Sequence, residues 1–124
     1  MNLSVSPGAE QPLYQQLYDR IAFGILRGDI APGSSIPPIR TVAQELRISV
    51  ISVKRAWEEL ERDGYIITAV GRGTTAALLS PEEKESRRKA ILSERLRSAV
   101  FLCRELGIPE EEAVDVFQAG LRQK

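Results

Sequence analysis

The sequence predicts a mainly α-helical protein with one small β-hairpin. Three observations support this fold class. Apolar residues recur every three or four positions through most of the 124-residue chain, which is the spacing of one face of a helix. Two such stretches are separated by a turn of only a few residues, and a glycine-centred segment rich in β-branched residues follows them. The last part of the chain then returns to helical spacing.

The first helix is expected in the stretch "QPLYQQLYDRIAFGILRGDIAPG". Pro12 suits its first turn, where a missing N–H costs little, and Gly28 suits its C-terminal stop. The stretch "DIAPGSS" that follows is predicted to be a turn. The inward face of the helix would be formed by Leu13, Leu17, Ile21 and Ile25.

Two further helices are expected over residues 37–63, joined by the short turn "RIS". Pro37 and Pro38 suit the start of the earlier helix, whereas Ser49 starts the later one and Asp63 ends it. The inward residues of the earlier helix are Ile39, Val42, Ala43 and Leu46. The later helix would bury Ile48, Val53, Ala56, Trp57 and Leu60, so Trp57 is interpreted as a core residue.

The segment after Gly64 reads as a β-hairpin with its tip at "VGRGT". Helix, helix, short turn, helix and hairpin together make a winged helix-turn-helix domain, which we assign to residues 11–79. Residues 1–10 are expected to form a flexible lead-in. Residues 80–124 are expected to form a C-terminal helical region.

This C-terminal region is predicted to hold two amphipathic helices. Ser80 and Pro81 open a charged helix whose apolar spacing begins only at Ile91, and Gly107 and Pro109 separate it from a shorter helix. Two such helices cannot bury both apolar faces alone, so a second copy of the chain is the simplest partner. The predicted dimerisation residues are Ile91, Leu92, Leu96, Ala99, Val100, Cys103, Leu106, Val116, Phe117 and Leu121.

Composition excludes several function classes. The chain has no histidine, which removes histidine-based catalysis and most zinc sites, and its one cysteine, Cys103, is interpreted as a buried thiol. We therefore predict no enzyme activity, no catalytic residue, no metal and no cofactor. The N-terminus lacks the pattern of a signal peptide and no apolar run reaches membrane length, so a cytoplasmic protein without a membrane partner is expected.

Charge is unevenly distributed within the predicted winged domain. The chain is neutral overall, but residues 40–55 hold four basic side chains against Glu45 alone, a local net charge of +3. A local basic excess is what the phosphates of double-stranded DNA attract. The third helix is narrow enough for the major groove, its first N–H groups can cradle a phosphate, and an arginine at the hairpin tip suits the minor groove.

Two stretches between Pro12 and Ala76 carry a specific resemblance, "PLYQQLYDRIAFGILRGDIAPGSSIPPIRTVAQEL" and "SVKRAWEELERDGYIITAVGRGT". This segment closely resembles the DNA-binding domain of GntR-family transcription regulators. The short two-helix tail is similar to that of the YtrA subfamily, which lacks a large effector-binding domain. The resemblance implies a bacterial repressor that dimerises through its tail and binds a pseudo-palindromic operator as a homodimer.

The family's DNA-contacting positions transfer residue by residue. Arg40 matches the arginine of the second helix, Ser49 and Ser52 match hydroxyl residues at the start of the recognition helix, and Lys54 matches a basic residue one turn on. The glycine-rich tip matches the wing. The complete predicted DNA-binding set is Arg40, Thr41, Ser49, Val50, Ile51, Ser52, Lys54, Arg55, Gly71, Arg72, Gly73 and Thr74.

Two positions depart from the family's pattern. Arg47 stands where the family has glycine, and a positive φ there would cost about 1 kcal/mol, offset by an added phosphate contact. Val50 stands where the family has a base-reading arginine, with Ile51 after it. Three interpretations stay open: Val50 and Ile51 contact thymine methyls, or they pack on neighbouring protein residues, or DNA binding is weak or altered.

An alternative function of a different class uses the winged-helix shape with Val50 and Ile51 exposed. The domain would then be a protein-interaction module without DNA binding, with Val50 and Ile51 as its hot spot. A small-molecule effector also remains open, and with so short a tail it would bind at the dimer interface or between the two parts of the chain.

Overall fold

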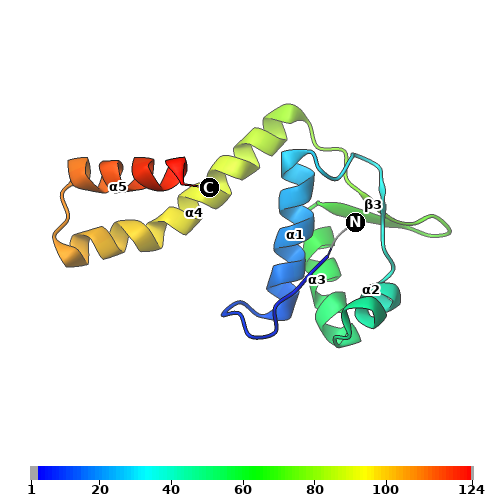
Figure 1. Cartoon of the computed structure of the whole chain (residues 1–124). Helices are drawn as coiled ribbons and strands as arrows, with labels where there is room; N and C mark the ends of the chain where they lie inside the picture. Colours follow the sequence, from blue (N-terminus) through cyan, green and yellow to red (C-terminus); the bar gives the residue numbers. More distant parts are fainter. Residues whose placement is uncertain (1–2, 124) are drawn as a thin grey trace. The chain divides into compact units, whose positions relative to one another are not determined.

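Figure 1 shows the computed structural model of the chain, which describes residues 3–123. Residues 1 and 2, at the start of the predicted lead-in, and residue 124, at the end of the predicted C-terminal region, lie outside the described part. The chain divides into two compact units, one reaching to Glu85 and the other starting at Ser86. Each unit is described by itself.

The first unit contains three helices and a small antiparallel sheet, which confirms the predicted fold class. Helices α1 and α2 and the strand β2 all pack against α3. The elements in chain order are α1 (Leu13–Arg27), β1 (Ser35–Ile36), α2 (Ile39–Leu46), α3 (Val50–Arg62), β2 (Ile66–Ala69) and β3 (Gly73–Ala76).

The core of the first unit is built from the inward faces that helical spacing predicts. Trp57 belongs to it, with 5% of its surface exposed and its Nε1 donating to the carbonyl oxygen of Pro37 at 3.2 Å. Leu13, Ile39, Leu46 and Ile48 are only half-buried, and Ile48 precedes α3 rather than lying in it. The largest fully buried side chains are Leu17, Ile21, Ile25, Val42, Val53, Leu60 and Ile66. Burial of this apolar surface is the main force that holds α3 in place.

The sheet has three strands, not the two of the predicted hairpin. The additional strand is β1, residues 35–36, which fall at the end of the predicted turn and the start of the predicted second helix. The strand order in the sheet is β1-β3-β2, and Ser35 of β1 lies opposite Thr75 of β3. Ile36 is buried, and the N–H of Ala76 donates to the carbonyl oxygen of Ser34 at 2.8 Å. A strand of two residues is too short for the alternating pattern by which strands are recognised, so the sequence pattern did not reveal it.

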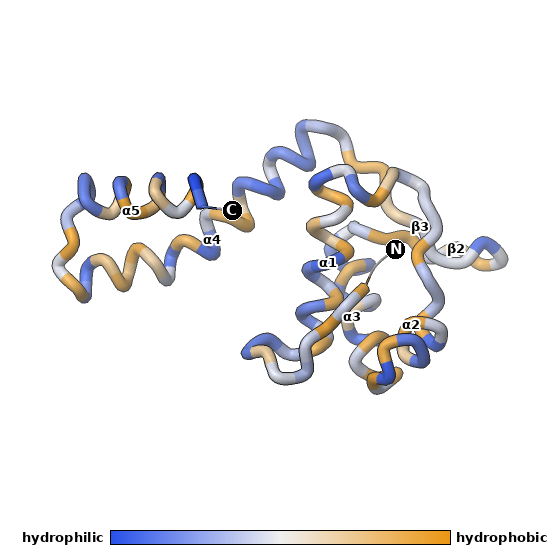
Figure 2. The backbone as a smooth tube through the Cα atoms, viewed as in Figure 1, coloured by the Kyte–Doolittle hydropathy of each residue, from blue (hydrophilic) through white to orange (hydrophobic). Residues whose placement is uncertain are grey.

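Helix α4 (Pro81–Leu106) begins where the first unit ends. Its start is closed by Ser80, whose Oγ accepts from the N–H of Glu83 at 3.1 Å. The second unit holds the rest of α4 and helix α5 (Glu110–Arg122), joined by a turn in which Gly107 has a φ of 68°. Figure 2 shows hydrophobic residues recurring along both helices, yet neither helix has a buried residue.

No helix in residues 3–123 is both long enough and apolar enough to cross a membrane.

Candidate nucleic-acid interface

The turn between α2 and α3 places Arg47 in the left-handed region. Its φ is 56° and its ψ is 47°, and within residues 3–123 it alone among the non-glycine residues has a positive φ. Its N–H donates to the carbonyl oxygen of Gln44 at 3.3 Å and so helps to end α2. The conformation that the family's glycine suits is therefore adopted by an arginine, at a strain of about 1 kcal/mol.

The first turn of α3 carries two apolar side chains. Ile51 is 79% exposed and Val50 is 43% exposed. The preceding Ser49 caps the helix, because its Oγ accepts from the N–H of Ile51 at 3.0 Å. Ser49 is itself exposed, whereas Ser52 is half-buried.

Arg40 and Lys54 lie in one groove on the surface of the first unit. The groove, about 570 Å³ in volume, is lined by Pro38, Ile39, Arg40, Lys54, Trp57, Glu58, Glu61, Thr68 and Thr74. It thus brings together predicted residues from α2, α3 and β3. Neither cation forms an ion pair with any other described residue, although Glu45 follows Arg40 on α2 and Glu58 follows Lys54 on α3.

Arg55 is in a different situation from Arg40 and Lys54. Its Nε lies 3.1 Å from Oε2 of Glu59, and its guanidinium lies over the ring of Tyr14 at 3.7 Å from the ring centre. The cation is therefore held between α3 and α1 and stabilises their packing. A DNA contact by Arg55 stays a prediction, and it would require this side chain to leave Tyr14 and Glu59.

The hairpin between β2 and β3 projects from the sheet in Figure 1. Gly71 and Gly73 have φ values of 79° and 74°, so both tip positions favour glycine. Arg72 between them is exposed and has no ion pair among the described residues. Thr74 and Thr68 face each other across the strands, with their hydroxyl oxygens 3.1 Å apart.

Sequence reasoning missed the exposure of Val70, which lies two residues before Arg72. Val70 is fully exposed at the hairpin tip, where an apolar side chain has no core to join. Its place in "VGRGT" could have indicated this, because residues between the strands of a hairpin point to solvent.

The C-terminal end of α3 is fixed to α1 by a polar contact. The hydroxyl of Tyr18 donates to Oδ2 of Asp63 at 2.5 Å, and the rings of Tyr18 and Tyr65 meet edge to face with centres 5.9 Å apart. Burial and this hydrogen bond to the Asp63 carboxylate raise the pKa of Tyr18 well above its ordinary value. Tyr18 therefore keeps its proton to a higher pH than an ordinary tyrosine does, and its hydrogen bond ties α1 to the residue that follows α3.

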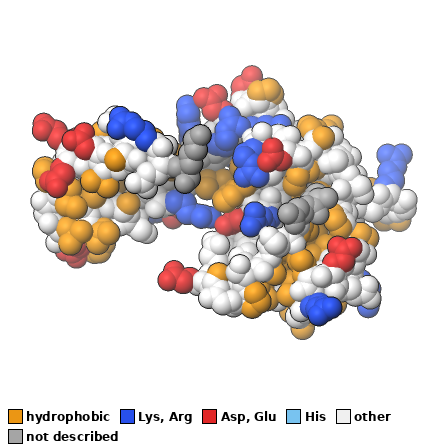
Figure 3. All heavy atoms as spheres, in the orientation of Figure 1, with side chains coloured by type: hydrophobic (Ala, Val, Ile, Leu, Met, Phe, Trp, Pro, Cys, Tyr) orange, Lys and Arg blue, Asp and Glu red, His pale blue; other side chains and the backbone are white. Residues whose placement is uncertain are grey.

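The second unit exposes the residues predicted for dimerisation. Ile91, Leu96 and Cys103 are half-buried, and the other seven are exposed. The prediction that Cys103 is a buried thiol is therefore wrong for the single chain, because its side chain is only half-buried. Figure 3 shows hydrophobic side chains gathered on the surface of this unit. The prediction omitted Phe101, Leu102 and Val114, which are also exposed.

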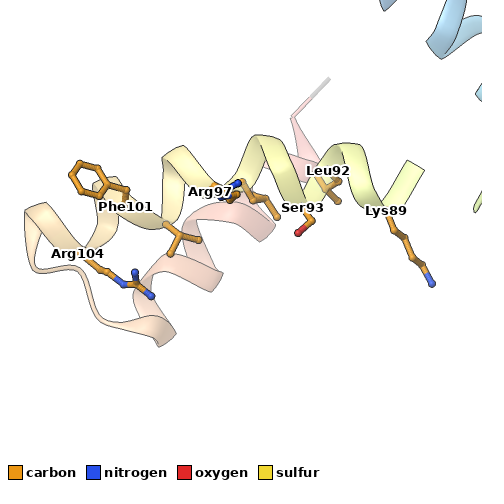
Figure 4. Close-up of a pocket in the computed structure, with 8 residues that line it drawn as sticks. Lys89, Leu92, Ser93, Arg97, Phe101 and Arg104 are labelled. Carbon is orange, nitrogen blue, oxygen red and sulfur yellow. The ribbon is translucent and has the colours of Figure 1, made fainter. Parts of the chain in front are cut away.

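Two hollows lie on the second unit. The first, shown in Figure 4, is about 490 Å³ in volume and mixes apolar and basic side chains: Lys89, Leu92, Ser93, Leu96, Arg97, Val100, Phe101 and Arg104. The second lies between α4 and α5, is about 360 Å³ in volume and is almost wholly apolar: Leu96, Ala99, Val100, Cys103, Ile108, Ala113, Val114, Val116 and Phe117. In residues 3–123 no three acidic or cysteine side chains gather as a metal site.

Residues 13–75 match the family described as bacterial regulatory proteins, gntR family. The chain is 26% identical over 110 residues to the HTH-type transcriptional repressor YtrA of Bacillus subtilis, covering 89% of this chain and 85% of YtrA. This match extends beyond the winged domain into α4, because 110 residues exceed the length of that domain.

Solved structures give the same picture of the fold. A GntR family transcriptional regulator from Listeria monocytogenes aligns with a TM-score of 0.76 at 23% identity, covering 89% of this chain and 96% of that one. The DNA-binding domain of AraR in complex with operator ORX1 aligns with a TM-score of 0.51 at 28% identity, covering 60% of this chain and 93% of that one.

The family match spans α1, α2, α3 and most of the sheet, and the relatives are transcription regulators rather than enzymes. The chain belongs to the GntR family of bacterial regulatory proteins and is a DNA-binding transcription regulator.

Proposed function

We propose that this protein is a repressor that binds a pseudo-palindromic operator as a homodimer. Each protomer inserts the start of α3 into a major groove and lays the hairpin tip along the backbone or into the minor groove. The observation that carries this proposal is that two cations, Arg40 and Lys54, line one groove and form no ion pair with any other described residue.

The residues divide by the kind of contact they would make. Arg40, Lys54 and Arg47 would neutralise phosphates, since each is exposed and has no ion pair among the described residues. Arg72 would make the wing contact. Thr41, Ser49 and Ser52 would add hydrogen bonds, although the cap to Ile51 already engages the hydroxyl of Ser49.

The repressor assignment is supported by the relative YtrA, which is named a transcriptional repressor and matches over most of its length. A repressor of this kind acts by occupying its operator. A dimer with two-fold symmetry would contact two half-sites about one helical turn, or roughly 10 base pairs, apart.

The homodimer is supported by the surface of α4 and α5. Within residues 86–123 every apolar side chain of these helices is exposed or half-buried, a state that a second copy would relieve. Charge favours the same occupant. The basic hollow on α4 includes Arg104, which has no ion pair among the described residues, while α5 begins with Glu110, Glu111 and Glu112.

The test is a DNA shift assay with a ladder of salt concentrations and three variants. Arg40→Ala and Lys54→Ala should each weaken binding about tenfold and lower the salt slope by about one, because each removes one phosphate contact. Arg27→Ala is the matched control, since Arg27 is an exposed arginine paired only with Asp29. Binding that ignores salt, or is equal in all variants, would refute the proposal.

The alternative module that binds protein instead of DNA has one observation in its favour, the exposure of Ile51. The same assay separates the two functions. A module of that kind would shift no DNA at any salt concentration.

A further inference from the structure

The first turn of α3 presents an apolar tip that the fold does not use. Ile51 is 79% exposed and Val50 is 43% exposed, although both lie on a helix whose opposite face is buried in the core. The interpretation that Ile51 packs on neighbouring protein residues therefore fails. The Ile51 side chain contributes little to the free energy of folding, because an apolar side chain stabilises the fold only through the surface that it buries.

The polar side chains of Ser49 and Arg55, near this tip, already make contacts within the protein. The Oγ of Ser49 caps α3, and the guanidinium of Arg55 lies between Tyr14 and Glu59. A guanine is read by two donors from one arginine or lysine to O6 and N7. Residues 49–52 contain neither residue type, so the leading turn of α3 offers no side chain for that contact.

The surroundings of the tip favour DNA as the partner of its apolar side chains. Arg40, Arg47 and Lys54 are exposed and lie within α2, the turn and the first turns of α3. Arg47 precedes and Lys54 follows the apolar pair in the chain. Cations on either side of apolar side chains suit a major groove, where phosphates flank the base edges. Thymine is the base that offers an apolar group there, the C5-methyl.

We propose that Ile51 and Val50 are specificity-determining residues that contact thymine methyls in each half-site. The inference rests on the proposed function, because it requires α3 to enter the major groove. It assigns to this chain a preference for A·T pairs at the position where an arginine at residue 50 would select G·C.

The methyl group itself is the probe. Deoxyuridine pairs as thymine does but lacks the C5-methyl, so a site selected by this protein is remade with deoxyuridine at one thymine at a time. For the full-length protein, affinity should fall about three- to fivefold at one or two positions per half-site, the loss expected for one buried methyl group. Elsewhere in the site the substitution should have no effect.

Variants show which side chain meets the methyl. Ile51→Ala should bind thymine and deoxyuridine sites equally at the position that Ile51 contacts, and Val50→Ala should do so at its own. Ile67→Ala is the matched control, because Ile67 is also an exposed isoleucine of the first unit but lies on β2. It should keep the full sensitivity to deoxyuridine.

The outcomes separate this inference from the proposed function. Tight, salt-dependent binding that is the same with thymine and deoxyuridine would overturn the inference and leave the proposed function standing. Sensitivity that persists in both Ile51→Ala and Val50→Ala would also overturn it, since another group would then read the methyl. Absence of binding to any DNA would overturn both. Val50→Arg should in addition shift the selected sequence toward G·C at one position, and an unchanged preference would count against the placement of Val50.

Discussion

The two units of the molecule treat their apolar residues in opposite ways. In the first unit, α1, α2, α3 and the sheet bury a common core that includes Ile21, Val53 and Leu60. In the second, α4 and α5 bury no residue. Similar helical spacing thus has two meanings here. In one unit it describes contacts made within the chain, and in the other it describes a surface that we assign to a second copy.

The largest effect should come from emptying a core position of the first unit. Leu60→Ala should lower the free energy of unfolding by about 2–5 kcal/mol, because Leu60 is fully buried and its truncation leaves a cavity in the core. Urea unfolding followed by Trp57 fluorescence measures this, since Trp57 lies in the same core. The matched change in the second unit, Leu106→Ala, should leave the Trp57 transition within about 0.5 kcal/mol of the parent. If Leu60→Ala and Leu106→Ala lowered the free energy of unfolding equally, the claim that only the first unit buries its apolar residues within the chain would be wrong.

The second unit should respond instead through association. Phe117→Asp would place a charge in the apolar hollow between α4 and α5, so we expect the dimer to dissociate at micromolar concentration. Sedimentation equilibrium measures the mass, and circular dichroism checks that the first unit stays folded. Glu111→Gln, a change at an exposed acidic position of α5, serves as a milder control and should weaken the dimer only slightly. A Phe117→Asp protein that remains dimeric would place the interface elsewhere.

A smaller effect is expected at the turn before α3. Arg47→Gly should raise stability by about 1 kcal/mol, because glycine adopts the observed φ of 56° without strain. The same variant should bind DNA less tightly and with a shallower salt dependence, since it removes a phosphate-binding cation. Thermal unfolding and the shift assay measure the two changes. A variant that loses stability would show that the side chain of Arg47 supports the fold.

An effect of similar size but opposite sign should come from Tyr18. Tyr18→Phe removes the hydrogen bond to Asp63 and should cost about 1 kcal/mol at neutral pH. Because folding raises the pKa of Tyr18, its contribution is complete below the ordinary tyrosine pKa of about 10 and is lost as pH rises through the folded-state pKa. Stability measured from pH 7 to pH 11 should therefore decline more steeply in the parent than in Tyr18→Phe. Parallel curves would contradict this role.

Much of the fold could be predicted because its signals are local. Gly28 ends α1 and Ser49 starts α3 through contacts with residues a few positions away, and the four-residue spacing from Leu17 to Ile25 describes the buried face of one helix. The strand β1 could not be predicted, because its two residues become a strand only by pairing with β3.

In the candidate site, too, local features could be predicted and contacts between distant residues could not. Ile51 is exposed, and Arg40 has no ion pair among residues 3–123, as their positions on the outward faces of helices suggest. The contact of Arg55 with Tyr14 could not be foreseen, because it joins residues far apart in the chain that meet only when α1 packs on α3. The same holds for Tyr18 and Asp63.

In vitro selection of bound DNA by the full-length protein tests the central claim most directly, because it depends on both units at once. The account predicts an enriched pseudo-palindrome, with two half-sites about one helical turn apart and A·T pairs where the start of α3 reads. Enrichment of a single unrepeated half-site would contradict the homodimer. Failure to enrich any sequence would contradict recognition by α3.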